Sequence, residues 1–301
     1  MIGRVLRSQS GQYWVRLDDG RVVHCTLRGR LKKARRARTD LAVIGDLVEI
    51  STLPEQDGEG VIEATLPRRN RFSRRQPGNR GRYKEHVLVA NLDWLFCVFA
   101  CSVPPMNPRL VDRFLVVAEL DGIDVAIVAN KVDAGDADAF APYEAIGYPV
   151  HRTSAKSGAG IDALRARIGD GVAAFVGPSG VGKSSLLNYL EPGLGAAVAE
   201  VSVALDKGRH TTRVAELHPL GGGGWIADTP GIRELAASFA LPADELASCF
   251  PEMRPFLDRC RFANCRHLSE PDCAVREAIS DGAITEARYD SYVRILQDEE
   301  R

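Results

Sequence analysis

The residues best suited to chemistry form a glycine-rich run, "GPSGVGKSS", in the middle of the chain. It matches G-x-x-x-x-G-K-[ST], follows the apolar run "AAFV" and opens the helical pattern "KSSLLNYL". In a strand–loop–helix setting, backbone N–H groups of such a run converge on a phosphate, its lysine bridges the β- and γ-phosphates, and its hydroxyl ligates Mg²⁺. We therefore expect a nucleotide site, with Lys183 catalytic and Ser184 on Mg²⁺, formed by Gly177, Pro178, Ser179, Gly180, Val181, Gly182, Lys183, Ser184 and Ser185.

A second polar segment, "NKVD", indicates which base is bound. It follows the apolar run "VAIV", and its Asp133 carboxylate can accept from both N1–H and the exocyclic amine of guanine, a pattern that adenine does not offer. The stem of Lys131 would cover the ring, and Asn130 would tie the loop together. A companion segment, where a backbone N–H could meet guanine O6, consists of Ser154, Ala155 and Lys156. Together these residues favour GTP and GDP as ligands.

A third segment, "DTPG", follows the apolar run "WIA". Asp228 would hold Mg²⁺ through water, and the N–H of Gly231 would contact the γ-phosphate. The run "DKGRHTTR" before it has threonines that could close on Mg²⁺, although taken alone it has the character of a polar loop. Every segment stands at a predicted strand end, and such ends meet at one edge of a parallel sheet. The base segment precedes the phosphate segment, so we predict a circularly permuted GTPase domain.

Three cysteines and one histidine near the C-terminus have the spacing of a metal site. The pattern C-x₄-C-x-H-x₅-C supplies three thiolates and one imidazole, a complete tetrahedral shell for one structural Zn²⁺. The predicted ligands are Cys260, Cys265, His267 and Cys273. A reduced cysteine cluster without metal is the alternative.

Composition and patterning suggest how the chain is organised around these segments. The predicted fold class is α/β: a circularly permuted P-loop GTPase domain with an N-terminal OB-type β-barrel and a C-terminal helical zinc-binding domain. Short β-prone runs predict the barrel over 1–70, and the polar stretch "RRNRFSRRQPGNRGRYKE" suggests a basic linker over 71–86. Alternating strands and helices place the GTPase domain at 87–236, and the helical zinc-binding domain follows at 237–301. A small β-domain used for docking is the alternative for the barrel.

The charge is segregated along the chain. Residues 1–86 hold 19 Lys/Arg against 10 Asp/Glu, a net +9, whereas the remaining residues carry −10. A basic lobe is typical of proteins that bind polyanions. The N-terminus lacks the apolar core of an export signal, and no apolar run is long enough for a membrane span, so we expect a cytoplasmic protein without membrane contact and without a disulfide framework.

The order NKVD, SAK, GPSGVGKSS, GRHTT, DTPG, between a barrel and a zinc knuckle, resembles the RsgA family of small ribosomal subunit biogenesis GTPases over essentially all 301 residues. The resemblance implies a monomeric GTPase that is stimulated by the small subunit, contacts its rRNA and acts late in its maturation. It also suggests Thr212 as the switch threonine on Mg²⁺. Ile232 occupies the position where Ras-like enzymes place a water-orienting glutamine, so His210 is the candidate for that catalytic task.

Two other functions fit parts of the sequence. The phosphate loop alone would suit a nucleotide kinase, against which NKVD and DTPG argue. An RNA-binding scaffold with GTP as a purely structural ligand is also compatible with Ile232.

Overall fold

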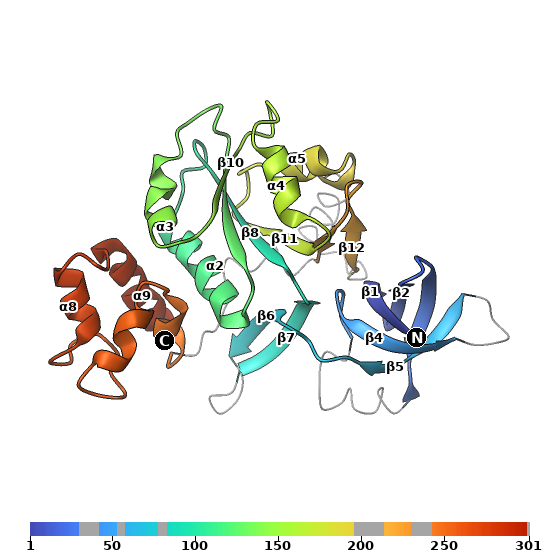
Figure 1. The fold of residues 1–301 in the computed structure, drawn as a ribbon, viewed down its shortest axis with the longest axis horizontal. Coiled ribbons are helices and arrows are strands. Elements are labelled where there is room, and N and C mark those ends of the chain that lie inside the picture. Colours follow the sequence, from blue (N-terminus) through green and yellow to red (C-terminus); the bar gives the residue numbers. More distant parts are fainter. Residues whose placement is uncertain (30–41, 53–57, 78–82, 196–213, 230–242, 300–301) are drawn as a thin grey trace.

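The structure is a computed structural model that describes residues 1–301 except 30–41, 53–57, 78–82, 196–213, 230–242 and 300–301. Figure 1 shows three parts side by side: the N-terminal barrel, a central sheet with its helices, and a helical C-terminal lobe on the side away from the barrel. Among the described residues, no helix has the length and apolar character needed to span a membrane.

The N-terminal part is a five-stranded barrel, as the sequence predicted. Its strands run in the order β1-β2-β3-β5-β4, and β4 closes the barrel by pairing with β1. Only β3 and β5 pair in parallel. Alternate side chains point inward, because a strand presents successive residues to opposite faces, and Val5, Val15 and Ile62 are fully buried. The strands are β1 (Ile2–Gln9), β2 (Gln12–Leu17), β3 (Val22–Leu27), β4 (Leu47–Thr52) and β5 (Glu59–Thr65).

The central sheet has the order β10-β9-β8-β11-β13-β12, in which all neighbours are parallel except β12 and β13. Strands β9 and β11 are buried at every position, as expected for parallel strands covered on both faces. Connections between such strands cross over through helices, which leaves the carboxyl ends of β8, β9, β10, β11 and β13 at one edge. The strands are β8 (Trp94–Ala100), β9 (Val125–Asn130), β10 (Val150–Thr153), β11 (Val172–Val176), β12 (Ala215–Pro219) and β13 (Trp225–Asp228).

Helices cover both faces of the central sheet. Successive residues of β8 enter two different cores: Cys97 packs with α2 on one face, and Phe96 packs with α4 and α5 on the other. Helix α3 and the short 3₁₀ helix η2 lie on the face that α2 covers. The helices are α2 (Pro108–Asp121), η2 (Asp138–Phe140), α3 (Ala141–Ala145), α4 (Ile161–Ile168) and α5 (Lys183–Leu190).

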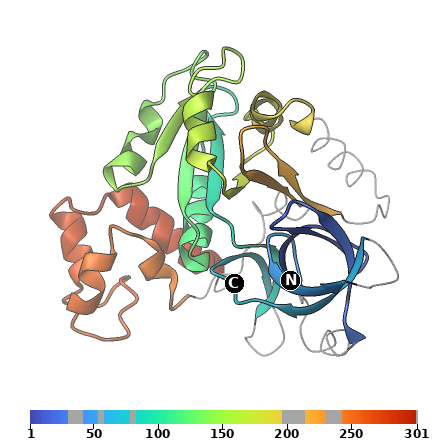
Figure 2. The same cartoon turned by 45° about the vertical axis from the view of Figure 1, so that its right-hand side comes forward.

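Strand β1 joins the barrel to the central sheet. Its first residues pair with β4, whereas Arg7 and Ser8 pair with β12. The register with β2 shifts between Val5 and Arg7, and such a bulge turns a strand. The Nε of Arg7 also lies 3.9 Å from the Glu216 carboxylate. The barrel is therefore hydrogen-bonded to the edge of the central sheet, beside which it lies in Figure 2.

The segment expected to be a basic linker, 71–86, differs from that expectation. Its described residues form most of a two-stranded antiparallel hairpin, β6 (Arg71–Pro77) and β7 (Tyr83–Ala90). Phe72 is fully buried, and the N–H of Ser73 donates to the Asp121 carboxylate of α2 at 3.0 Å. The hairpin therefore packs on the central part, and the other predicted domain boundaries remain predictions.

The C-terminal lobe is helical and fastened to α2. It contains η4 (Leu246–Cys249), η5 (Arg254–Arg259), α8 (Ala274–Ser280) and α9 (Glu286–Glu299). The buried Arg288 guanidinium pairs with the Asp112 carboxylate of α2 and, at 2.6 Å, with Glu252. Ser291 donates to the same Asp112 carboxylate. A buried ionic cluster thus joins the lobe to the central sheet.

Candidate nucleotide-binding site and candidate metal centre

The predicted phosphate loop connects β11 to α5, as its strand–loop–helix context suggested. Gly177 has a φ of 142°, and a side chain there would collide with the Val98 carbonyl oxygen. Gly182, with a φ of 97°, is the N-cap of α5, and a Cβ there would collide with the Asn130 amide. Glycine permits both conformations and both close approaches. The loop then leads directly into the N-terminus of α5 at the sheet edge, where a phosphate could bind.

The Lys183 amine is held over this loop. Its Nζ donates to the carbonyl oxygens of Gly177 at 2.7 Å and Pro178 at 2.6 Å. Ser184 and Ser185 lie in the first turn of α5 and are exposed. The amine and the hydroxyls are thus on the side of the loop where a phosphate chain would approach a helix N-terminus.

Asn130 connects three loops from a buried position. Its side-chain amide donates to the Val181 carbonyl oxygen of the phosphate loop at 2.8 Å. Its side-chain oxygen accepts from the Thr153 hydroxyl at 3.2 Å and from the Ala155 N–H at 3.3 Å. One side chain therefore brings together the predicted phosphate segment and both predicted base segments.

Lys131 follows in a left-handed conformation with a φ of 64°. Its amine donates to the Gly180 carbonyl oxygen at 2.7 Å and to that of Val103. The stem of Lys131 consequently lies next to the phosphate loop. The contact with Val103, in the loop after β8, had no signal in the sequence because it uses a main-chain oxygen.

Asp133 stands opposite the companion segment. The Ser154 hydroxyl donates to its carboxylate at 2.6 Å, and the Lys156 amine lies 4.0 Å from the other carboxylate oxygen. These contacts, the Ser154 hydrogen bond first, hold the pKa of Asp133 below its ordinary value. Since an ionised carboxylate has lone pairs left over, Asp133 can accept two further hydrogen bonds of the kind that guanine donates.

The third predicted segment is described only in part. Asp228 ends β13, the strand next to β11, and Thr229 after it is buried. Gly231, His210 and Thr212 lie outside the described residues. Asp228 is therefore at the same sheet edge as the phosphate loop, while the predicted switch residues stay predictions.

The four predicted metal ligands come together in the C-terminal lobe. The ligand atoms of Cys260, Cys265, His267 and Cys273 all lie within 4.8 Å of one another. The Nδ1 of His267 is 3.5 Å from the sulfur atoms of Cys260 and Cys273, which are themselves 4.0 Å apart. Tetrahedral zinc with Zn–S bonds of ~2.3 Å separates its sulfur ligands by about 3.8 Å. The cluster therefore has the size and the donor set of a closed zinc site.

Protonation and the surrounding hydrogen bonds also suit a metal. Burial lowers the pKa of His267, which favours the neutral imidazole that a metal needs, and raises the pKa of Cys265 to about 12. Metal binding must therefore displace thiol protons. The hydroxyls of Tyr289 and Tyr292 donate to the carbonyl oxygens of His267 and Arg266 at 2.7 and 2.8 Å. Sequence reasoning missed both tyrosines, whose only signal is a helical spacing on α9.

The arrangement defines the class of the protein as a P-loop GTPase with a circularly permuted domain. The strands that carry NKVD and SAK, β9 and β10, precede β11 and its phosphate loop in the chain, yet all three end at one sheet edge. One similar solved structure is named "The crystal structure of YloQ, a circularly permuted GTPase". It has a TM-score of 0.72 and 30% identity, covering 99% of this chain and 94% of that chain.

The comparisons with known proteins identify the family. The family model for the RsgA GTPase matches residues 65–238, and that for the RsgA N-terminal domain matches residues 2–62. The chain belongs to the RsgA GTPase family and is a GTP hydrolase. The resemblance and the fold class inferred from the sequence are thus confirmed.

The similarity to curated relatives extends over almost the full length of the chain. The "Small ribosomal subunit biogenesis GTPase RsgA" of Gemmatimonas aurantiaca is 47% identical, covering 99% of this chain and 96% of that protein. The protein of the same name from Moorella thermoacetica is 43% identical, covering 98% and 96%. The crystal structure of YjeQ from Thermotoga maritima has a TM-score of 0.76 and 32% identity, covering 99% of this chain and 98% of that chain.

Proposed function

We propose that this GTPase binds the small ribosomal subunit, is stimulated by it, and acts as a checkpoint late in that subunit's maturation, hydrolysing GTP to GDP and phosphate. The observation that carries the nucleotide part is the junction at Asn130, which fixes the base segments against the phosphate loop. The subunit part is supported by the names of the relatives and by the basic residues of the N-terminal lobe.

Guanine is read by the two base segments. The Asp133 carboxylate accepts from N1–H and the exocyclic amine, and the Lys131 stem covers one ring face from its position beside the phosphate loop. A backbone N–H of the companion segment, which Asn130 and the Ser154 hydroxyl hold in place, meets O6. The proposed base-binding residues are Asn130, Lys131, Asp133, Ser154, Ala155 and Lys156.

The phosphates are held by the loop from Gly177 to Ser185. On binding, the Lys183 amine exchanges one of its carbonyl partners for β- and γ-phosphate oxygens, which concentrates positive charge where charge moves during transfer. The residues that would hold Mg²⁺ are Ser184, Asp228 and Thr212, and Mg²⁺ when bound neutralises the phosphate oxygens. The Gly231 N–H contacts the γ-phosphate, and His210 orients the attacking water.

The remaining partners follow from the flanking parts. Cys260, Cys265, His267 and Cys273 would hold one structural Zn²⁺, which stiffens the C-terminal lobe and takes no part in hydrolysis. The basic N-terminal barrel contacts rRNA phosphates. We further propose that the chain acts in the cytoplasm as a monomer.

The test is GTP turnover by the full chain alone, with purified small subunits, and with large subunits as the control. We expect slow turnover alone and a large increase with small subunits only. Equal stimulation by both subunits would remove the proposed specificity. Tight GTP binding with no turnover under any condition would instead support the RNA-binding scaffold, and phosphate transfer to GMP would support a nucleotide kinase.

A further inference from the structure

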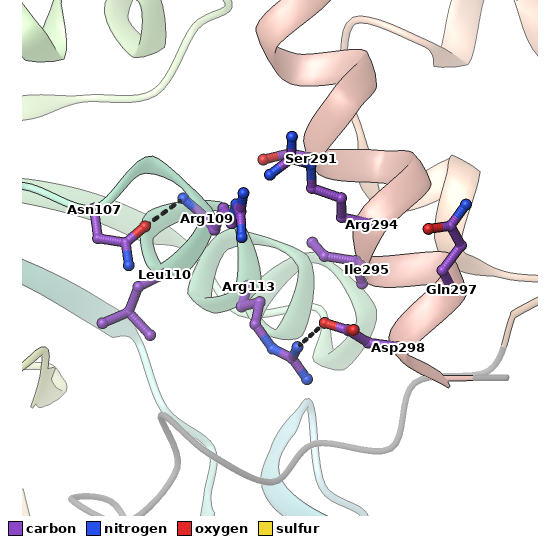
Figure 3. A pocket seen from close by; sticks show the side chains of 9 residues that line it. All are labelled: Asn107, Arg109, Leu110, Arg113, Ser291, Arg294, Ile295, Gln297 and Asp298. Atoms are coloured by element: carbon purple, nitrogen blue, oxygen red, sulfur yellow. Dashed lines mark hydrogen bonds and ion pairs between the residues drawn. The ribbon is translucent and has the colours of Figure 1, made fainter. Parts of the chain in front are cut away.

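A groove separates the central domain from the C-terminal lobe at α2 and α9. It encloses about 530 Å³ between the two helices. Figure 3 shows its side chains coming from both sides. The lining residues are Asn107, Arg109, Leu110, Arg113, Ser291, Arg294, Ile295, Gln297 and Asp298. No residue of the proposed nucleotide site or of the metal cluster is among them.

The groove is positively charged. Arg109 of α2 and Arg294 of α9 are exposed, and in Figure 3 both side chains extend into the space between the helices. Arg113 pairs at 3.3 Å with Asp298, the one carboxylate among the described lining residues. Within the described part of the chain, neither Arg109 nor Arg294 has a carboxylate partner. Two guanidinium groups that share a groove without a counterion repel one another, and an anion bound between them would relieve that repulsion.

The N-terminus of α2 adds to this potential. Asn107 is the N-cap, and its side-chain oxygen accepts from the Arg109 N–H at 3.1 Å. Pro108 occupies the first helical position. The positive end of this helix of 14 residues therefore lies at Asn107, which lines the groove together with Arg109. Two independent sources of positive potential converge at one end of the groove.

The lining favours the phosphate group of a polymer over a nucleotide or nucleobase. Guanidinium groups bind phosphate oxygens in pairs, with two parallel hydrogen bonds. Among the described lining residues there is no aromatic side chain on which a base could stack, and the Ser291 hydroxyl is occupied with Asp112. Arginines as exposed as these bind a single small anion weakly, because water screens them, so several contacts along one backbone are needed.

We propose that the groove between α2 and α9 binds a phosphodiester segment of RNA. This inference rests on the proposed function, in which the partner is an RNA-rich particle, and adds a second RNA contact distant in sequence from the barrel. The groove is also linked through the chain to the proposed base site. Asn107 ends the loop in which the Val103 carbonyl oxygen accepts from Lys131. RNA bound to α2 would therefore contact the helix that directly follows the loop holding Lys131 of the proposed base site.

The test measures binding of a short, unstructured, fluorescent RNA to the full chain with GDP, by anisotropy over a range of salt concentrations. The variant is Arg109→Glu/Arg294→Gln. Glutamate near the N-terminus of α2 favours the helix, so loss of binding would not reflect an unfolded α2. We expect the slope of log affinity against log salt to shrink by about 1.4, since each lost phosphate contact removes roughly 0.7 on a single strand.

Matched variants decide what such a loss means. Arg276→Glu, on an exposed position of α8 in the same lobe, reverses one charge outside the groove and should keep a slope near that of the wild type. Arg109→Lys/Arg294→Lys should keep most of the slope, because it retains both charges. A slope for the Glu/Gln variant equal to that of wild type overturns the proposal, and so does a full loss with Arg276→Glu.

Competition experiments distinguish RNA from other anions as the ligand of the groove. A separate measurement of subunit binding distinguishes failure of this inference from failure of the proposed function. Inorganic phosphate and poly-L-glutamate, each at matched ionic strength, should displace RNA poorly. Displacement as effective as that by unlabelled RNA would make the groove a general anion site and would reject the RNA assignment. A chain that binds small and large subunits equally well would refute the proposed function, while the RNA slopes of the variants would still decide the groove.

Discussion

The side-chain amide of Asn130 donates a 2.8 Å hydrogen bond to the main-chain carbonyl oxygen of Val181, a residue 51 positions further along the chain. Asn130 ends β9 and Val181 lies in the phosphate loop after β11, so the bond spans two loops that the chain order separates. A nucleotide site depends on where loops meet in space and not on their order. Circular permutation leaves this contact intact because β9 and β11 both end at the same edge of the sheet.

Asn130→Ala should weaken GDP and GTP binding by roughly tenfold or more. The change leaves the Val181 carbonyl oxygen and the buried Thr153 hydroxyl without this partner, at a cost of about 1–3 kcal/mol for each unsatisfied group. Titration with fluorescent GDP measures the effect. Asn70→Ala is the control, because Asn70 also clamps a backbone segment through Leu92 but lies at the amino ends of β8 and β9, opposite the edge that carries the site. It should cost stability without lowering affinity. Unchanged GDP affinity in Asn130→Ala would show that the loops are positioned by other contacts.

Asp133→Asn should shift the nucleotide preference from GTP toward XTP. An amide can donate to the C2 carbonyl of xanthine, where the carboxylate accepts from the amine of guanine. The Ser154 hydroxyl, 2.6 Å from the Asp133 carboxylate, can still hold the side chain in place. Competition between GTP and XTP for a fluorescent nucleotide measures the preference. Asp136→Asn, an exposed change in the same loop, should leave it unchanged, and an unaltered preference in Asp133→Asn would remove that residue from the base site.

Because Ser154 holds the pKa of Asp133 below its ordinary value, the carboxylate should stay ionised through the neutral and mildly acidic range. Guanine binding in that range should therefore show no loss from this group. Affinity should fall only when the pH drops through the lowered pKa, since protonation removes an acceptor. In Ser154→Ala the fall should begin at a higher pH, and identical pH profiles for the two proteins would contradict the assigned cause.

Cys265→Ser should lower the zinc content of the purified chain and loosen the C-terminal lobe. The substitution removes one of four thiolate or imidazole ligands, and a serine hydroxyl is a poor replacement for a thiolate. Because the binding energy of a structural metal is part of the folding energy, the lobe should also lose stability. Metal analysis and limited proteolysis provide the two measurements. Cys101→Ser, outside the cluster, should keep stoichiometric zinc. Stoichiometric zinc in Cys265→Ser would refute the ligand assignment.

Arg288→Met should destabilise the junction between the lobe and α2 by about 3–5 kcal/mol, because it leaves buried carboxylates without their cationic partner. Those carboxylates belong to Asp112 and Glu252, and each is almost completely buried. Urea unfolding gives the free energy of unfolding. Arg276→Met, at an exposed position on α8, should change it little. A comparable small effect of both substitutions would mean that the ionic cluster contributes little to the attachment of the lobe.

The sequence predicted the parts of the site whose information is local. A phosphate loop needs glycines, a lysine and a hydroxyl in consecutive positions, and the conformations of Gly177 and Gly182 follow from that loop alone. The cysteines and His267 likewise lie within 14 residues, so their spacing indicated a shared metal. The alternation of apolar runs with helical patterns was sufficient for the parallel sheet, because buried strands and amphipathic helices have different periods.

Contacts that use main-chain atoms or distant partners were not predictable in this way. The hairpin in 71–86 is rich in arginine, and what folds it is burial of Phe72 and a hydrogen bond from Ser73 to Asp121, a residue 48 positions away. The pairing of β1 with β12 is a backbone interaction, and the Arg7–Glu216 ion pair beside it joins residues that are far apart in the sequence. The polarity of the local sequence therefore predicted a linker, whereas tertiary contacts hold this segment as part of a hairpin.

The remaining prediction concerns how the GTPase turns over without a switch glutamine. Ile232 cannot hydrogen-bond a water molecule, so intrinsic hydrolysis should be slow. His210 and Thr212, which like Ile232 lie outside the described residues, are two positions apart, and a loop closing on Mg²⁺ through Thr212 would bring the imidazole toward the γ-phosphate. A neutral imidazole near pH 7 can donate to or accept from water, which suits the orientation of a nucleophile.

His210→Ala should consequently bind GTP and small subunits nearly as the wild type does, yet lose most of the stimulated turnover. Supplying a missing catalytic group to a GTPase raises turnover by ~10³-fold or more, so the loss should be large. Single-turnover hydrolysis with saturating small subunits separates the chemical step from binding. His218→Ala, in the described strand β12, removes an imidazole that has no assigned role and should keep its stimulation. If His210→Ala keeps full stimulated turnover, the water must be oriented by a group that the ribosomal partner donates, because the residue directly after Gly231 is Ile232 and not glutamine.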